Sequence, residues 1–344
     1  MEPNLNEKAL GALFAPTGGI CNPYNVAFGA IENAVQNGVA IRFNAKAVRI
    51  SREEEQGWSV SLADGSRIHA MCIVNAAGVH ADELNNQISA HTIHITPRRG
   101  EYCLLDTDFG PTFSHTMFQA PTAQGKGVLV KPTTHGNLLI GPNAVAQDDK
   151  DDVSTTAEGL RDVLHRAEKT WPHLNCRGII TNFCGIRATG DTGDFVIGQP
   201  DDAPGLFNIA CFDSPGLTSA PAVAVDVAAD VASFLSASER DGFDPERHGY
   251  MKAFAEMDDI ERARAIAKGP RAGQMVCRCC NVTEADILHA FESRIPVLDI
   301  DCLKWRCGAM MGRCHGGFCT PEIVKTFVHE TGIDANDVDK RLPG

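Results

Sequence analysis

The spacing of hydrophobic residues predicts mixed helices and strands over residues 1–236. Apolar positions at helical intervals predict a helix over residues 27–37, which Gly38 would end. Short apolar or alternating runs predict strands, at residues 39–43, 58–62, 67–74, 127–131, 137–140 and 207–211. The last of these precedes a long Ala/Val-rich helical run. The pattern predicts one large α/β or α+β domain.

Two more helices are predicted near the C-terminus. Thr283 is a helix cap followed three residues later by the acid Asp286. Thr320 is a second cap, followed by Pro321 where a first helical position would lie. Apolar residues recur at helical spacing behind both caps, so each helix has a face to bury. These helices predict a small helical domain over residues 275–335.

A charged segment separates the two predicted domains. Residues 237–274 are helix-prone, and Asp258 and Arg262 stand four positions apart, as on an exposed helix. The segment ends in a Gly-Pro-Arg-Ala-Gly run at 269–273, which is typical of a domain boundary. We therefore interpret residues 237–274 as a connecting arm.

Composition narrows the classes of partner. The chain has 344 residues and a formal net charge of −13, without a basic block, so nucleic acid is not expected as a partner. No apolar run reaches the roughly 20 residues that a membrane helix needs. The longest candidate, residues 219–235, is interrupted by Asp226 and Asp230. We expect no direct membrane span, and any membrane contact would be made through a partner.

Four cysteines give the strongest chemical signal: Cys277, Cys279, Cys314 and Cys319. Each pair lies in a loop directly before a predicted helix, so positive helix ends would face an anionic four-thiolate site. This favours a [2Fe–2S] cluster. Zinc is the alternative, although its structural sites usually use C-x₂₋₄-C spacing rather than C-x-C. Simple buried thiols do not suit cysteines flanked by arginines and glycines.

The other nine cysteines have weaker signals. Cys280, Cys302 and Cys307 are near enough in sequence to compete as ligands, although no helix-start signal follows the last two. The remaining six lie in apolar stretches, as core cysteines do. An odd total of 13 without a signal peptide predicts a reducing compartment, and hence a cytoplasmic protein.

Several loops of the larger part are candidates for binding. Residues 214–218, Ser-Pro-Gly-Leu-Thr, precede the Ala/Val-rich helix and would aim its N-terminus at a bound anionic group. Small residues at Ala77 and Gly78 allow a ligand to approach the backbone, or simply allow tight packing. Arg187, near Gly185, suits a clamp for carboxylate or phosphate, unless it pairs with Asp191 or Asp194.

Two further polar stretches, residues 98–102 and 132–137, are predicted as loops at strand ends. His135 in the second has a pKa range suited to proton transfer, although a lone histidine is more often structural.

Several motifs, in order, resemble those of one enzyme family. They are residues 2–5 (EPNL), 11–16 (GALFAP), 74–78 (VNAAG), 97–102 (PRRGEY), 185–187 (GIR) and 214–218 (SPGLT). Together they resemble the FAD-dependent glycerol-3-phosphate dehydrogenase and 2-hydroxyglutarate dehydrogenase group of D-amino-acid-oxidase-like flavoproteins. The C-terminal part resembles the [2Fe–2S] domain of the bacterioferritin-associated ferredoxin type, called BFD-like, in its fused form.

The resemblance implies a fold, cofactors and residue roles. Residues at the flavin ring would be Gly185, Ile186, Arg187, Ser214, Pro215, Gly216, Leu217 and Thr218. Ala77 and Gly78 would line the diphosphate and ribose, and the backbone of Val48 would meet the adenine. The implied reaction passes electrons from a small anionic hydroxy substrate through FAD to the cluster, and then to a partner subunit or another acceptor.

One family motif is missing. The G-x-G-x-x-G turn that holds the FAD diphosphate does not occur in this sequence, which resembles the family from partway into its pattern. We therefore expect an N-terminally truncated oxidoreductase domain, which would be an enzyme if the FAD-binding segment is supplied. The alternative is a non-catalytic chain or subunit that binds only the cluster and acts in electron transfer or assembly.

Overall fold

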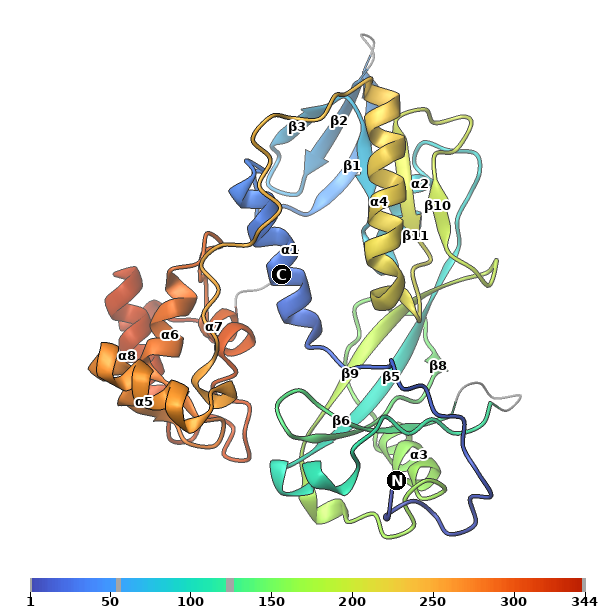
Figure 1. Ribbon diagram of the computed structural model, residues 1–344. Helices are drawn as coiled ribbons and strands as arrows, with labels where there is room; N and C mark the ends of the chain where they lie inside the picture. The colour runs from blue at the N-terminus through green and yellow to red at the C-terminus, as the bar shows by residue number, and fades with distance from the viewer. Residues whose placement is uncertain (1, 54–56, 122–126, 342–344) are drawn as a thin grey trace.

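The computed structural model describes residues 2–53, 57–121 and 127–341. Figure 1 shows a long oxidoreductase part and a separate lobe of short helices beside it. The helices are α1 (Pro23–Gln36), α2 (Ala81–Asn85), α3 (Ala157–Ala167), α4 (Gly216–Leu235), α5 (Asp259–Lys268), α6 (Glu284–Phe291), α7 (Ile300–Cys307) and α8 (Thr320–Thr331).

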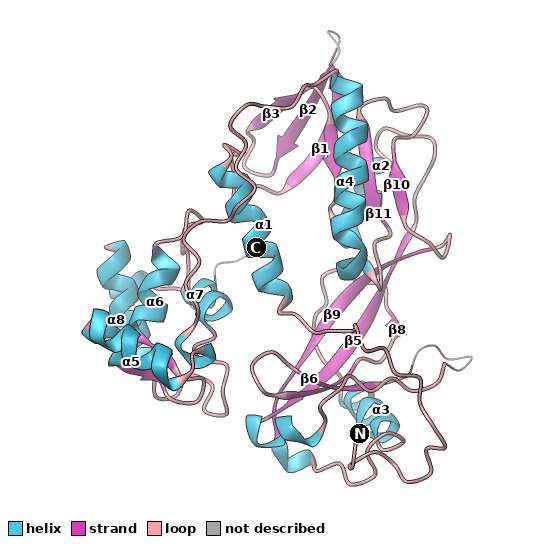
Figure 2. Cartoon of the chain, in the orientation of Figure 1, coloured by secondary structure: helices cyan, strands magenta, loops and turns pink. Residues whose placement is uncertain are grey.

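The strands form four separate sheets, and their secondary structure is coloured in Figure 2. The strands are β1 (Ala47–Glu53), β2 (Gly57–Leu62), β3 (Arg67–Ala70), β4 (Ile73–Asn75), β5 (Ile95–Leu105), β6 (Leu129–Pro132), β7 (Leu138–Gly141), β8 (Val145–Ala146), β9 (Ile179–Gly190), β10 (Val196–Gly198), β11 (Leu206–Ala210), β12 (Met275–Cys277) and β13 (Val282–Thr283).

The five-stranded sheet is built on two long antiparallel strands. β5 and β9 pair over nearly their whole length, and β7 and β8 pair with the other side of β5. Helix α3 covers one face of this sheet, where buried Leu138, Ile140 and Val163 form part of a continuous core. Thr156 caps α3 by accepting a hydrogen bond from the Gly159 N–H. Within the described part of the chain, no helix packs in this way on the opposite face of the sheet, which carries Arg98, Gly100 and Tyr102.

A second sheet pairs β4 in parallel with β11, and β10 completes it in the order β10-β11-β4. Buried Asn75 and Asn208 lie side by side in this pair, and Asn75 donates a hydrogen bond to the Asn208 side chain at 2.9 Å. The loops after β4 and β11 leave the sheet at the same carboxyl edge. In open α/β sheets this edge is where ligands bind.

Helix α4 contradicts the expectation that no apolar run reaches the length of a membrane helix. It is 20 residues long, and its mean hydropathy of 1.3 over an 18-residue window is enough for a membrane span by length and composition. Asp226 and Asp230 do not lower that mean enough because the surrounding residues are mostly alanine and valine. One such helix is weak evidence for a span. Here Phe234 of α4 packs edge-on against Phe207 of β11, at a ring distance of 5.7 Å.

The cysteine-containing lobe contacts helix α1. Tyr24 stacks on Trp305 of α7 with ring centroids 4.2 Å apart, and the Arg306 guanidinium lies over the Phe28 ring. A second contact is made by Arg313, which pairs with Asp106 at 2.7 Å. The lobe is therefore fixed to the larger part at two places.

The predicted connecting arm does not stand free. Its first half runs along α1, where Asn33 and Asn37 donate to the backbone oxygen of Asp244. In its second half the Phe254 N–H donates to Asp286 of α6, and α5 begins at a capping box formed by Asp258 and Glu261. Residues 237–274 thus pack on both of the parts that they connect.

Several element predictions are confirmed and others were wrong. The helix before Gly38, the hairpin of β6 and β7, strand β11 and helices α4, α5, α6 and α8 are present. No strand forms at 39–43, and the predicted strand at 67–74 is two strands that belong to different sheets. The stretch 98–102 is not a loop but the middle of β5, where it pairs with β9 and where the polar residues Arg99 and Glu101 are buried.

Candidate functional site

The uncovered face of the long sheet presents Arg187 among glycines. Gly100 pairs with Gly185 across β5 and β9, and Arg98 pairs with Arg187 two positions along. A methyl group on Gly100 would lie 2.6 Å from the Arg187 Nη2 atom, so the glycine leaves room for the arginine to lie along the sheet. At Gly185 the same space is empty. The two glycines therefore leave unoccupied space on the sheet surface beside the guanidinium.

Arg187 is held without an acidic partner. Its Nη2 donates to the Asn143 backbone oxygen at 3.0 Å, and within the described ranges it forms no ion pair with Asp191 or Asp194. Tyr102 lies beside it and stacks on Phe183 at a ring distance of 5.0 Å. Burial raises the pKa of Tyr102, so its phenol stays protonated as a hydrogen-bonding group. A cation and a phenol thus face the open side of the sheet.

The neighbouring residues on the covered face have structural roles. Arg99 donates to Gln147 and pairs with Asp152. Glu101 is fully buried, and its carboxylate accepts from the Asn143 amide at 2.6 Å and from the Thr156 hydroxyl at 3.0 Å. These contacts hold the start of α3 against β5, because a buried carboxylate is stable only when it is fully hydrogen-bonded.

His135 does not join Arg187. It lies in the exposed turn between β6 and β7, where its Nε2 is 3.0 Å from the Asn22 amide nitrogen. Leu105 pairs with Leu138 beside this turn, whereas Arg98 pairs with Arg187. Seven residues along β5 separate these positions, roughly 23 Å at the usual rise of a strand. The structure therefore does not bring the two predicted catalytic residues together.

The predicted cofactor residues of two loops do come together. Ala77 and Gly78 follow β4, Gly78 with a φ of +59°, and residues 214–218 follow the parallel neighbour β11. Thr189, at the end of β9, donates to Asp213 at 2.6 Å and so holds the second loop beside the substrate face. No side chain caps the first turn of α4, although the Gly216 N–H donates to the Asp213 backbone oxygen at 2.6 Å.

Cys211 occupies a position that favours glycine. The backbone at Cys211 has a φ of +54°, in the left-handed region that a side chain rarely adopts. The thiol packs against Gly190, where any side chain would lie 2.5 Å from the sulfur. The absence of a side chain at Gly190 therefore leaves the space that the Cys211 thiol occupies.

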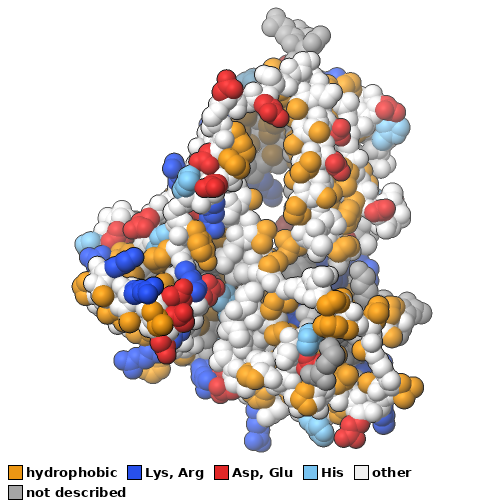
Figure 3. Space-filling model, viewed as in Figure 1, with side chains coloured by type: hydrophobic (Ala, Val, Ile, Leu, Met, Phe, Trp, Pro, Cys, Tyr) orange, Lys and Arg blue, Asp and Glu red, His pale blue; other side chains and the backbone are white. Residues whose placement is uncertain are grey.

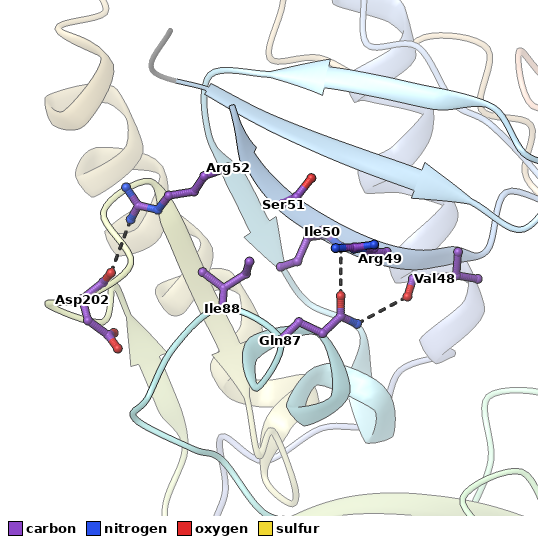
Figure 4. A pocket seen from close by; sticks show the side chains of 8 residues that line it. All are labelled: Val48, Arg49, Ile50, Ser51, Arg52, Gln87, Ile88 and Asp202. Atoms are coloured by element: carbon purple, nitrogen blue, oxygen red, sulfur yellow. Dashed lines mark hydrogen bonds between the residues drawn. The ribbon is translucent and has the colours of Figure 1, made fainter. Parts of the chain in front are cut away.

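Two adjoining depressions lie along strand β1. The larger, of about 670 Å³, is lined by Val48, Ile50 and Gln87 among others (Figure 4). Gln87 bridges β1 by accepting from the Ile50 N–H at 3.0 Å and donating to the Val48 oxygen at 3.3 Å. The smaller, of about 390 Å³, is lined by Ile50 and Ala77 among others. Val48 and Ala77 are thus on one continuous surface.

The thiols of the helical lobe cluster between α6 and α8. The sulfur atoms of Cys279 and Cys314 are 3.6 Å apart, and the Cys277 thiol contacts those of Cys280 and Cys319. A hydrogen bond from Cys280 lowers the pKa of Cys277 to about 5. The structure thus pairs Cys279 with Cys314 and Cys277 with Cys319, and it adds Cys280 beside Cys277.

The loops that carry these thiols touch each other closely. A methyl group on Gly312 would lie 2.2 Å from the Cys279 Cβ, so this glycine permits the contact. Over the described residues, no group of three or more His, Cys, Asp or Glu side chains has the geometry to hold a metal ion. Of the two helices beside these thiols, only α6 has a side-chain cap, Thr283; the predicted cap at Thr320 was wrong, because α8 begins at Thr320 and its N-cap residue, Cys319, makes no capping hydrogen bond. The chemistry of the donor set, four thiols near the starts of two helices, nevertheless suits a thiolate-bound cluster.

The two remaining cysteines of the lobe belong to its packing. Cys302 and Cys307 lie on α7, a helix that begins at the Asp299 cap and that the sequence analysis missed. The Cys307 thiol donates to the Leu303 oxygen, and burial raises its pKa to about 12. The Asp-x-x-Cys spacing before α7 was the signal that could have identified this helix.

The fold and its two loops at one sheet edge define a class: flavin-type oxidoreductases with an antiparallel substrate sheet. The pattern of the FAD dependent oxidoreductase family matches residues 1–230, and the chain belongs to that family. A glycerol 3-phosphate dehydrogenase of Caloramator mitchellensis is 38% identical over 347 residues, which cover the whole of this chain and 71% of that protein.

Two further relatives match about two thirds of the chain. A glycerol 3-phosphate oxidase of Mycoplasma genitalium is 29% identical, over 65% of this chain and 59% of its own length. The FAD-bound L-alpha-glycerophosphate oxidase of Mycoplasma pneumoniae superposes with a TM-score of 0.56 at 28% identity, over 64% of this chain and 56% of that one. The mixed α/β fold of this family is thereby established.

Proposed function

We propose that this chain forms the substrate-binding and distal-cofactor part of an FAD-dependent oxidoreductase that oxidises a small anionic hydroxy compound, glycerol 3-phosphate in the first place. The observation that supports this most is the position of Arg187, unpaired by any acid within the described ranges, on an open sheet face next to the edge formed by β4 and β11. The named relatives act on glycerol 3-phosphate or are named for it.

The roles of the chain's own residues follow from this arrangement. FAD, when bound, supplies the acceptor for a hydride from the substrate C–H bond. Arg187 and Tyr102 orient the substrate anion. The positive N-terminal end of α4, which no side chain caps, stabilises negative charge on the group bound there. Val48, Ala77 and Gly78 line the surface for the adenosine half.

The lobe would carry electrons away. Cys277, Cys279, Cys314 and Cys319 would hold a [2Fe–2S] cluster, which when bound accepts one electron at a time. Support comes from the proximity of the thiols and from the two helices that start beside them, of which Thr283 caps α6. The Caloramator relative is similar over this lobe as well as over the rest of the chain. A partner subunit or soluble acceptor would take the electrons, in the cytoplasm or at a membrane surface.

The test is an anaerobic purification with iron, sulfide and flavin measured on one sample, before and after a G-x-G-x-x-G dinucleotide-binding segment is supplied, fused or in trans. Bound flavin and glycerol 3-phosphate oxidation after the addition support the enzyme. A cluster without flavin or activity in both samples supports the alternative, a chain that only transfers electrons or assists assembly. Zinc in place of iron would reject both roles for the lobe.

The ligand set is tested by single replacements. Cys279→Ser and Cys314→Ser should each remove most of the iron and the visible absorption of the cluster. Cys302→Ser is the matched control, since that thiol lies on α7 in the packing of the lobe, and it should keep both. Loss of iron in the control, or its retention in the two variants, would contradict the assignment.

A further inference from the structure

The open face of the long sheet carries two arginines side by side. Arg98 and Arg187 are directly opposite residues of β5 and β9, and in an antiparallel pair such residues point to the same face. Both are half-buried. The sheet therefore holds two positive charges next to each other where solvent only partly screens them.

Neither charge is neutralised within the described part of the chain. Arg98 forms no hydrogen bond or ion pair there, and Arg187 donates only to a backbone oxygen and to the neighbouring phenol. Arg99, the next residue along β5, is the internal comparison: on the other face it is buried, paired with Asp152 and bonded to Gln147. The same strand thus satisfies one arginine completely and leaves its neighbour without a partner.

Like charges directly opposite each other destabilise a sheet. The cost is recovered only if a group with two negative charges binds between them. A phosphate monoester is such a group near neutral pH, and its oxygens accept the paired N–H groups of two guanidinium forks. A carboxylate carries one charge and needs only one arginine.

We infer that Arg98 is the second half of a two-arginine clamp for a phosphate monoester, with Arg187 as the first half. This inference rests on the proposed function for the location of the substrate, and it adds the reason why a phosphorylated substrate is preferred to a hydroxy acid. The open space above Gly185 gives the rest of the substrate a place beside the clamp.

The test is equilibrium binding to the full chain, by calorimetry, of glycerol 3-phosphate, inorganic phosphate and lactate. Arg98→Gln should weaken binding of the two phosphates by about tenfold or more and that of lactate by less than about threefold. Arg187→Gln should weaken all three. The control is Arg161→Gln, an exposed arginine of α3 on the covered side of the sheet, which should change none.

Thermal unfolding shows whether the variants fold. Arg98→Gln removes a like-charge pair, so its Tm should equal or exceed that of the parent chain. If Arg98→Gln binds phosphate as tightly as Arg161→Gln does, the clamp is wrong. Binding that depends on Arg98 in a chain that oxidises nothing would support the clamp and reject the proposed function. Oxidation of glycerol 3-phosphate unaffected by Arg98→Gln would do the reverse.

Discussion

The long sheet and the edge formed by β4 and β11, here called the cofactor edge, differ in how far helices cover them. Beneath β5, β6 and β7, Phe113, Leu138 and Trp171 belong to a core that α3 seals from solvent. Around β4 and β11 the cover is uneven: the short helix α2 buries Ala81, Asp82 and Asn85, whereas the long helix α4 buries one residue, Val227. Figure 3 shows apolar side chains gathered along the exposed surface of α4.

The two regions differ in whether their own packing is sufficient or a further segment is needed to cover them. The long sheet is stabilised by its own packing, so its open face is free to hold a substrate. A parallel strand pair is normally covered on both faces. Here β4 is an edge strand, and Val74 within it is exposed. The cofactor edge therefore suits completion by FAD and a dinucleotide-binding segment, in agreement with the proposed function.

The largest expected effect is on the closed region. Phe113→Ala should lower the free energy of unfolding by about 3–5 kcal/mol, because it removes a ring that is 2% exposed and packed edge-on against Trp171. Denaturant unfolding followed by tryptophan fluorescence measures this. Phe118→Ala, at a residue that is 64% exposed, is the matched control and should cost less than about 0.5 kcal/mol. Similar losses in the two variants would remove the basis of the comparison.

The substrate face is probed by a pair of glycines. Gly100→Ala places a methyl group 2.6 Å from the Arg187 Nη2 atom, so it should displace the guanidinium and weaken phosphate binding by roughly tenfold. Gly185→Ala meets open space at the paired position and should bind within about twofold of the parent. Calorimetric titration with glycerol 3-phosphate distinguishes them. Equal affinities would mean that Arg187 does not hold the anion.

The open region should tolerate a polar residue. Val225 on α4 is 69% exposed, so Val225→Gln should change the free energy of unfolding of this chain by less than about 0.5 kcal/mol. The same change should reduce flavin retention once the dinucleotide-binding segment is supplied and covers α4. A loss of more than about 1 kcal/mol in the chain alone would show that α4 is already packed.

The smallest effect is a dependence on pH at the boundary of the two regions. Hydrogen bonding to Glu83 and Asp151 raises the pKa of His80. A raised pKa in the folded chain means that the stabilisation is complete below the ordinary pKa of histidine and is lost as pH rises through the raised value. The Tm difference between the parent and His80→Gln should therefore shrink as pH rises. His80 is half-buried, but its partners Glu83 and Asp151 are 56% and 77% exposed, so solvent screens both pairs and the effect is a few tenths of a kcal/mol at most.

Much of the fold could be predicted where local signals act alone. The cap at Thr283, the breaker at Gly38 and the turn between β6 and β7 were identified from neighbouring residues, because capping and turn formation use side chains within a few positions. Asp258 was predicted only as a helix-face partner of Arg262, whereas it is the N-cap of α5. The strand over Arg98 was missed because its partner, β9, lies about ninety residues away, and pairing at that distance leaves little local pattern.

The sequence by itself determined the kinds of groups present: four thiols near the starts of two helices, an arginine among glycines, and small residues after a short strand. Only the tertiary structure decided which of them meet. It placed Arg98 opposite Arg187, brought Cys280 into the thiol cluster and left His135 at a distant turn. The physical reason is strand register: a shift of one residue would turn every side chain of β5 to the other face, and tertiary packing fixes that register.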